Sequence, residues 1–212
     1  MPPQTATQKA DTLISALEQY GQGDYIGEPI SQLEHCLQAA HQARNNDANP
    51  DLIIAALLHD VGQIIPVSKT EDVRMDLSSS SSESPGTAAG GGGNVGRVGH
   101  ESIGAAYLRG LGFSEEVCAL VASHVPAKRF LSAIDNAYYD DLSSASKKSL
   151  AFQGGPFQGE ELEAFMRHPL RDQMVALRRW DDAAKIEGIR DKTPPAGSYR
   201  DLIVAHLERQ AC

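Results

Sequence analysis

Apolar residues recur along most of this chain at the three-to-four-residue spacing of one helix face. Between residues 11 and 20, for example, Leu13, Ile14 and Leu17 fall on one side of a helix. No segment shows the strict alternation of a strand, and we find no internal repeat. The pattern predicts an all-α fold with helices at about 11–20, 31–45, 51–62, 100–109, 114–123, 126–135, 144–152, 158–167, 170–185 and 198–210.

Polar residues mark where several of these helices begin. Ser31 is followed three residues later by Glu34, which is a capping-box pattern. Asn49 precedes Pro50, as an N-cap before proline at the first helical position. Ser114 is an N-cap residue ahead of the 114–123 segment. The helix predicted at 51–62, DLIIAALLHDVG, is apolar almost all round and should therefore be central and buried.

Between residues 67 and 99 the composition changes abruptly. This stretch contains SSSSSES and PGTAAGGGG, which cannot supply side chains for a packed core. We expect a flexible surface insertion here. Because the candidate functional residues lie on both sides of it, we expect residues 1–212 to form a single domain.

Composition limits the kinds of partner and location. With 212 residues, 41% hydrophobic and 22% charged, the chain has ordinary globular composition. A formal net charge of −9 argues against a nucleic-acid partner, although a few local cations can still bind a small anion. No apolar run approaches the roughly 20 residues of a membrane span, and the first residues do not resemble a secretory signal. Cys36, Cys118 and Cys212 are scattered, so we expect free thiols, no membrane association and a cytoplasmic location.

The candidate chemistry is that of a metal site. His59 and Asp60 lie at the end of the most apolar predicted helix, where a carboxylate needs a cation because an unpaired buried charge is costly. Other candidates stand near helix ends or on an apolar helix face, and each alone has an ordinary reading as a core or surface residue: His35, His100, His124 and Asp181. Imidazole and carboxylate together suit iron, manganese or zinc and not calcium.

The ordered pattern of these six residues resembles the HD-domain superfamily of metal-dependent proteins, which are helical bundles. Longer stretches are similar to the 2-amino-1-hydroxyethylphosphonate dioxygenases, mixed-valent diiron oxygenases related to myo-inositol oxygenase. They are DYIGEPISQLEH, AALLHDVG, GHESIGAAYLRGLGFSEEVCALVASHVPAKRF, LSSASKKSLAFQGGP and RRWDDAAK. The segments HVPAKRF and AFQGGP are far more specific than the His-Asp pair.

This resemblance implies two irons, Fe(II) and Fe(III), and assigns a role to each matching residue. One iron would be held by His35, His59, Asp60 and Asp181, and the other by Asp60, His100 and His124, with Asp60 bridging. Tyr25, Asp60 and Lys128 are the expected catalytic residues, Tyr25 occupying an iron position until substrate displaces it. Glu28 would face a substrate amine, and the phosphonate would lie among Lys128, Ser146 and Arg178.

One residue departs from the family pattern. After the His-Asp pair the family usually has a hydrophobic residue, glycine and histidine, whereas this chain has Gln63 in the last place. The related inositol enzyme has a substrate-contacting lysine there, so we expect Gln63 to contact substrate. Glutamine can form hydrogen bonds but cannot carry a proton as imidazole does near neutral pH.

Three functional hypotheses follow. The first is an oxygenase that uses O₂ to cleave the C–P bond of a 1-hydroxyalkylphosphonate, such as 2-amino-1-hydroxyethylphosphonate, to glycine and phosphate. The alternative is an HD-type phosphohydrolase of a phosphomonoester or nucleotide, in which the same metals activate water. The third is a non-catalytic binding module that keeps only the fold. The expected partners are a phosphonate and O₂, in a monomer or weak homo-oligomer.

Overall fold

Helices make up all the regular secondary structure of the part of the chain that the computed structural model describes, residues 4–25, 27–66, 68 and 97–211. The α-helices are α1 (Ala6–Tyr20), α2 (Gln32–Asn45), α3 (Pro50–Leu58), α4 (Val61–Ile64), α6 (His100–Leu111), α7 (Glu115–Ala122), α8 (His124–Ile134), α9 (Asn136–Asp141), α10 (Ser144–Phe152), α11 (Gly159–Met166), α12 (Arg171–Ala183) and α13 (Arg200–Gln210). Two 3₁₀ turns, Arg190–Lys192 and Ala196–Tyr199, lie between α12 and α13. The all-α fold class is confirmed. Most of the insertion predicted at 67–99 lies outside the described residues.

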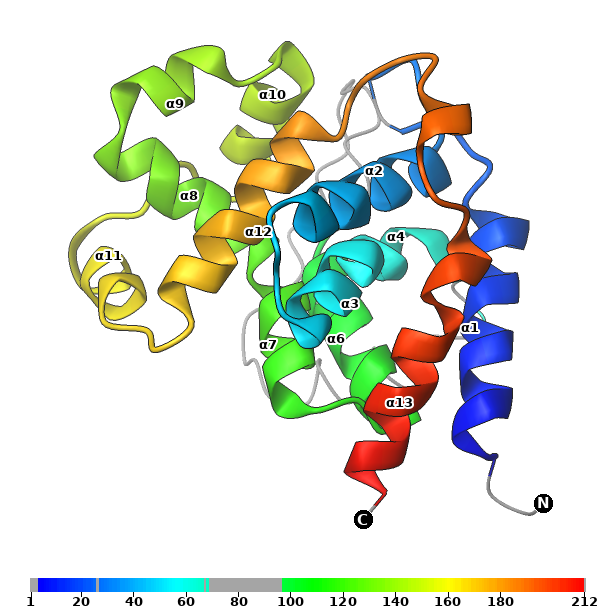
Figure 1. Ribbon diagram of the computed structural model, residues 1–212. Coiled ribbons are helices and arrows are strands. Elements are labelled where there is room, and N and C mark those ends of the chain that lie inside the picture. Colours follow the sequence, from blue (N-terminus) through cyan, green and yellow to red (C-terminus); the bar gives the residue numbers. More distant parts are fainter. Residues whose placement is uncertain (1–3, 26, 67, 69–96, 212) are drawn as a thin grey trace.

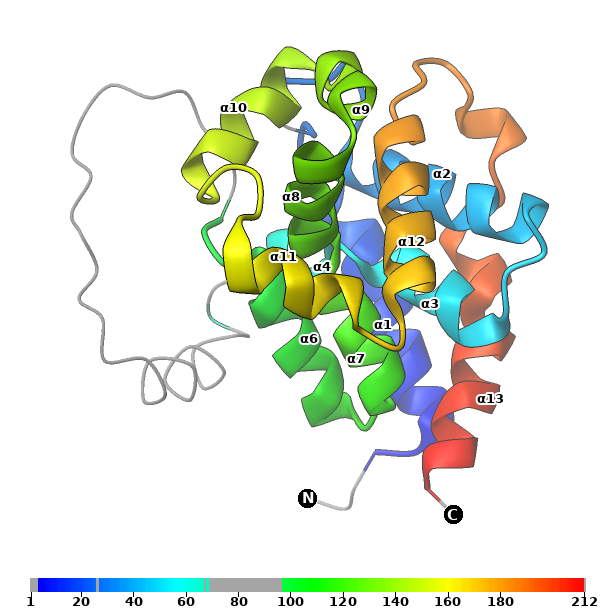
Figure 2. The same ribbon diagram turned by 90° about the vertical axis from the view of Figure 1, so that its left-hand side faces the viewer.

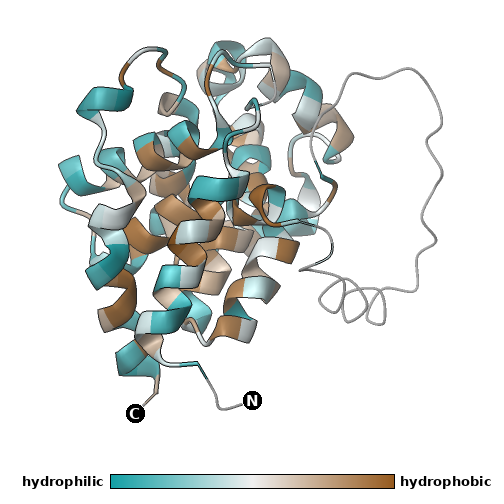
Figure 3. Ribbon diagram, turned by 90° about the vertical axis from the view of Figure 1, so that its right-hand side faces the viewer, coloured by the Kyte–Doolittle hydropathy of each residue, from teal (hydrophilic) through white to brown (hydrophobic). Residues whose placement is uncertain are grey.

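Helix α3 is the centre of the bundle, as its sequence predicts. It contacts α2, α7, α12 and α13, and six of its nine residues are buried. Figure 3 shows the brown, hydrophobic segments gathered in the interior, with teal segments outside. The helix is capped by Asn49, whose side chain accepts a hydrogen bond from the Leu52 amide at 2.8 Å.

Helices α1 and α13 lie side by side along one edge of the bundle (Figure 1). A buried histidine on α13, His206, connects this helix to the start of α3 and to the residue before α7 by hydrogen bonds. Its Nδ1 donates to Asp51 at the start of α3 at 2.9 Å, and its Nε2 accepts the Ser114 amide at 3.1 Å. His206 is therefore a structural residue of the bundle.

On the other side of the bundle, α8 and α12 pack against each other, with α9 and α10 at one end of the pair and α11 beside α8 (Figure 2). This group of helices packs against the rest of the bundle mainly through α12, which contacts α2, α3 and α7. The functional site lies between the two groups.

Most predicted helices are found within a few residues of their expected ends. The capping box of Ser31 and Glu34 and the N-cap of Ser114 are both present. The helix predicted at 51–62 is interrupted, because α3 ends at Leu58 and Asp60 has φ −99° and ψ 13°, outside the helical region. His59 and Asp60 thus lie in the turn before α4. Helix α9 was missed, because its sequence NAYYDD has no apolar period and buries none of its residues.

Among the described residues, no single helix is both long and apolar enough to cross a membrane. Only α7 and α8 taken together meet that test, and they are bent by 52° relative to each other.

Candidate metal centre

The six predicted ligands are buried and converge from separate parts of the chain. They form two groups of three, and within each group the ligand atoms all lie within 4.8 Å of one another. The first triad is His35 from α2, His59 from the turn after α3, and Asp181 from α12. The second triad is Asp60 from the same turn, His100 at the start of α6, and His124 at the start of α8.

Each ligand histidine is oriented by a hydrogen bond from its Nδ1 to a backbone carbonyl. The acceptors for His35, His59, His100 and His124 are Ala184, Ala56, Arg97 and Val121, at 2.8 to 2.9 Å. A carbonyl only accepts, so each Nδ1 carries the proton and each Nε2 is left with a lone pair. This arrangement fixes the tautomer that binds metal through Nε2.

The Nε2 atoms face each other in pairs, at 3.0 Å between His35 and His59 and 2.9 Å between His100 and His124. Two lone pairs at this distance repel each other unless a cation lies next to both. Burial lowers the pKa of His124 to about 3 and also lowers the pKa of His59. These two imidazoles, one in each pair, therefore stay neutral near neutral pH. The geometry of both pairs therefore fits a metal ion.

Asp60, a member of the second triad, also faces the first and turns one oxygen to each pair of histidines. Its Oδ2 is 3.8 and 3.7 Å from the Nε2 atoms of His35 and His59, and its Oδ1 is 3.4 and 3.5 Å from those of His100 and His124. Burial by itself would raise the pKa of Asp60, but the four imidazoles outweigh it and lower the pKa to about 2. The carboxylate is thus ionised, and each of its oxygens faces a different pair of histidines.

One carboxylate oxygen of Asp181 faces the histidines of the first triad. Its Oδ1 is buried, has no hydrogen-bond partner, and lies 3.2 Å from Nε2 of His35. Its Oδ2 accepts a hydrogen bond from Arg178 Nη1 at 2.7 Å. Buried carboxylate oxygens without a partner are rare in proteins, and a metal ligand is a direct explanation.

A glycine allows the turn carrying Asp60 to approach the helix carrying His100. A Cβ atom on Gly62 would lie 2.0 Å from the carbonyl oxygen of His100 and 2.7 Å from the amide of Gly104. The backbone of α4 at Gly62 therefore lies directly against the backbone of α6 at His100 and Gly104. This close approach brings two ligands of the second triad together.

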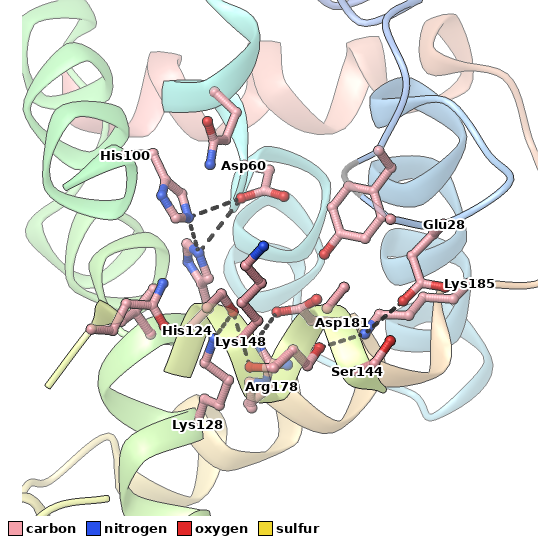
Figure 4. Close-up of a pocket in the computed structure, with 18 residues that line it drawn as sticks. Glu28, Asp60, His100, His124, Lys128, Ser144, Lys148, Arg178, Asp181 and Lys185 are labelled. Carbon is pink, nitrogen blue, oxygen red and sulfur yellow. Dashed lines mark hydrogen bonds and ion pairs between the residues drawn. The ribbon is translucent and has the colours of Figure 1, made fainter. Parts of the chain in front are cut away.

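A cavity of about 390 Å³ opens onto both triads (Figure 4). Figure 4 shows His100 and His124 facing Asp60 on one side of it, and Glu28 with Lys185 on the other. All the predicted substrate-contacting residues line the cavity: Tyr25, Glu28, Gln63, Lys128, Ser146 and Arg178.

Tyr25 lies against a ligand of the first triad. Its ring stacks on the imidazole of His35, with centroids 3.8 Å apart and an interplanar angle of 16°. Its backbone amide donates to Ile30 at 2.8 Å, which closes the loop before α2. Desolvation and the nearby Asp181 and Asp60 raise the pKa of Tyr25, so its hydroxyl stays protonated near neutral pH unless a cation displaces the proton.

Comparison with known proteins agrees with this geometry. Residues 33–143 match the HD domain family. The chain is 33% identical over 204 residues to the hydroxymethylphosphonate dioxygenase of Gimesia maris, covering 96% of this chain and 90% of that protein. It is 34% identical over 171 residues to the 1-hydroxy-2-(trimethylamino)ethylphosphonate dioxygenase (glycine-betaine-forming) of Leisingera caerulea, covering 78% and 74%. An uncharacterized protein of Acanthamoeba polyphaga mimivirus is 32% identical over 200 residues, covering 94% and 82%.

The chain belongs to the HD-domain phosphonate dioxygenase family. The family resemblance places Arg178 at the phosphonate, but in the structure its side chain is bonded to other residues of the protein. All three of its guanidinium nitrogens donate to groups of the protein: Nη1 to Asp181, Nη2 to Asp182, and Nε to Asp182 and to the hydroxyl of Tyr138. Arg178 lines the cavity of this HD domain, but it is also the direct partner of a predicted metal ligand.

Two further cation–hydroxyl pairs lie in the cavity wall of the HD domain. Lys128 donates from Nζ to Ser149 Oγ at 2.7 Å, and Lys185 donates to Ser146 Oγ at 3.0 Å. Burial, together with the neighbouring Arg178, lowers the pKa of Lys128 to about 7. Lys185 also lies 4.0 Å from Glu28 Oε1. The residue expected to receive a substrate amine therefore already faces a lysine.

Sequence reasoning missed several residues of this site, although the family motifs contain most of them. Ser149 and Gln153 lie within LSSASKKSLAFQGGP, and Asp182 and Lys185 lie within RRWDDAAK. Tyr138 belongs to the missed helix α9 and carried no signal.

Proposed function

We propose that this protein is a diiron oxygenase that uses O₂ to cleave the C–P bond of a 1-hydroxyalkylphosphonate. The products are phosphate and the carboxylic acid formed from C1, which is glycine when the substrate is 2-amino-1-hydroxyethylphosphonate. The observation that carries the proposal is the shared cavity, in which ligands from both triads and four cationic side chains, those of Lys128, Lys148, Arg178 and Lys185, line the same space.

The reaction balances without a further reductant. A 1-hydroxyalkylphosphonic acid and one O₂ contain the same atoms as one carboxylic acid and one phosphoric acid. All four electrons that reduce O₂ come from the substrate carbon and its C–P bond. When bound, a mixed-valent Fe(II)/Fe(III) pair would supply the activation of O₂ and the removal of hydrogen from C1.

The residues of the cavity would bind and orient the substrate. Protonated Lys128 offers an ammonium beside Ser149, which suits a phosphonate oxygen because charge-assisted hydrogen bonds are the stronger kind. Lys185 and Ser146 form a similar pair. Tyr25, stacked on His35 at the first triad, would move aside as substrate binds.

Glu28 is the candidate for selecting an aminated substrate. Its carboxylate lines the same cavity, at the edge opposite His100, and would pair with an ammonium. The relatives named above differ in their substrates, one lacking an amine and one carrying a trimethylated nitrogen. The amine-binding role therefore needs a direct comparison of substrates.

The test is oxygen consumption by the iron-loaded protein with a panel of substrates. The panel contains 2-amino-1-hydroxyethylphosphonate, its N-trimethyl analogue and hydroxymethylphosphonate, with phosphate and carboxylate products measured. We expect one phosphate per O₂ and no phosphate under strictly anaerobic conditions. Asp60→Asn is the matched inactive control. Phosphate release that continues without O₂ would instead support the phosphohydrolase.

A further inference from the structure

Each metal triad has a glutamine beside it that is not a ligand. We propose that Gln38 positions the first triad and Gln63 positions the second, so that the two metal positions are held independently. The inference concerns how this chain holds metal, and it does not depend on which reaction the metals carry out.

Gln63 connects the turn of Asp60 to the segment before His100. Its Oε1 accepts a hydrogen bond from the backbone amide of Arg97 at 2.8 Å. The carbonyl of the same Arg97 accepts the proton of His100 Nδ1 at 2.9 Å. Gln63 thus holds the residue whose carbonyl orients His100, while its own backbone amide donates to the backbone carbonyl of Asp60 at 2.8 Å.

The side chain of Arg97 strengthens this connection. Its guanidinium donates to the carbonyls of Gly62 at 2.9 Å and of Ile65 at 3.0 Å. These carbonyls belong to α4 and the residue that follows it, where backbone acceptors are left without helical partners. The segment 60–65 and the segment 97–100 are therefore joined by three hydrogen bonds, and each segment carries one ligand of the second triad.

Gln38 makes the equivalent connection at the first triad. It lies one turn after His35 on α2 and is buried. Its Nε2 donates to the carbonyl of Ile186 at 2.8 Å, and its Oε1 accepts the amide of Ile186 at 3.0 Å. Two residues earlier, the carbonyl of Ala184 accepts the proton of His35 Nδ1 at 2.8 Å.

The segment that Gln38 holds also follows directly after the helix bearing Asp181. Helix α12 ends at Ala183, so fixing Ile186 fixes both the end of this helix and the carbonyl that orients His35. A glutamine amide suits this task because it donates and accepts at once and satisfies both polar groups of a single peptide residue.

The two connections use different parts of the chain. The one made by Gln38 joins α2 to the segment after α12, and the one made by Gln63 joins α4 to the segment before α6. Where the triads meet, Asp60 faces both and the ring of His59 lies against that of His124, but neither glutamine side chain bonds to these residues. Removing one glutamine should therefore weaken one metal position and leave the other unchanged.

The experiment is an anaerobic Fe(II) titration of the full chain, with the affinity of each of the two equivalents measured. Gln63→Leu and Gln38→Leu should each weaken one equivalent by about tenfold, the lower end of the effect of losing a hydrogen bond to a metal ligand, because each glutamine acts through the backbone that makes that bond. The retained equivalent shows in the same molecules that the fold is intact. Each variant is thus the control for the other.

Single-site backgrounds assign the positions. In His124→Ala, where only the first triad is complete, Gln38→Leu should weaken iron binding and Gln63→Leu should not. In His35→Ala the order should be reversed. Gln8→Leu is the matched remote control, because Gln8 Oε1 also accepts a backbone amide, that of Thr5 at 3.0 Å, on the exposed start of α1.

Gln63→Glu separates loss of the accepting oxygen from loss of the amide donors. It keeps an oxygen for the Arg97 amide but loses the amide donors, so both iron affinities should be retained. Weakening of both positions by either leucine variant, or of neither, contradicts the proposal, as does a loss in Gln63→Glu equal to that in Gln63→Leu. The titration uses neither substrate nor O₂, so failure of the proposed oxygenase activity would be seen separately.

Discussion

Arg178 Nη1 donates to Asp181 Oδ2 at 2.7 Å, and both side chains are almost completely buried. The bond leaves Asp181 Oδ1 directed at the first triad. The guanidinium offsets part of the free-energy cost of burying the Asp181 carboxylate. Burial alone would raise the pKa of Asp181, but Arg178 and His35 hold it well below its ordinary value. A residue expected to bind only phosphonate therefore also supports a metal ligand.

Replacing Arg178 should weaken both metal and substrate binding. Arg178→Gln leaves a buried carboxylate without its cation, which is a strongly destabilising change. We expect the first iron position to weaken about tenfold or more and the Michaelis constant for a phosphonate to rise about tenfold or more, as for loss of a charge-assisted hydrogen bond. Arg178→Lys keeps the charge but not the fork of donors, so its losses should be smaller. Unchanged iron affinity in Arg178→Gln would show that Asp181 needs no such partner.

Asp60 should be needed by both metals and Asp181 by one. Asp60 turns a different oxygen to each triad, whereas the free oxygen of Asp181 faces only the first. Metal analysis of Asp60→Asn should find neither position filled, and Asp181→Asn should keep the second. An Asp60→Asn protein that retains one full equivalent of iron would show that the carboxylate does not bridge.

Lys128 should make substrate capture depend on pH. Because the pKa of Lys128 is lowered to about 7, its ammonium is present below that pH and lost above it. We expect kcat/KM for a phosphonate to fall as pH rises through about 7, since kcat/KM reports groups of the free enzyme.

The control is Lys128→Arg, because arginine stays charged throughout this range. The phosphonate's own titration is the same for both proteins, so the difference between the two profiles isolates Lys128. Identical profiles would exclude Lys128 as the titrating group.

Glu28 and Lys185 should set the preference for a substrate amine. Lys185 lies 4.0 Å from Glu28, so a substrate ammonium must share the carboxylate with a lysine. Glu28→Gln should raise the Michaelis constant for 2-amino-1-hydroxyethylphosphonate more than that for hydroxymethylphosphonate. Equal changes for both substrates would remove Glu28 from amine recognition.

The sequence was sufficient for the fold class and for the six residues that the structure brings together in two triads, because both leave local signals. Helix periodicity and caps such as Asn49 before Pro50 act within one or two turns, and a histidine or aspartate in an apolar segment is unusual enough to notice. Which ligands form each triad was predictable only through the family resemblance. The pairing of His35 with Asp181 depends on tertiary packing that no spacing encodes.

The surroundings of the ligands could not be predicted in the same way. Gln38 looks like any polar residue of α2, and Gln63 was interpreted as a substrate contact because of its place in a motif. Their bonds to Ile186 and Arg97 reach backbone atoms, which have no residue-specific signature in the sequence. Tyr138 was missed for another reason: its side-chain partner Asp182 lies on a different helix, and no sequence spacing pairs the two.

Because of the order of the ligands along the chain, the residues of the two triads are completed at different times during synthesis. Asp60, His100 and His124, with Gln63 and Arg97, all lie in one contiguous portion of the chain. The first triad and its glutamine link α2 to α12 and the residues after it, so they remain incomplete until Asp181 and Ile186 have left the ribosome. A nascent chain therefore has the complete ligand set for one metal position well before it has the other.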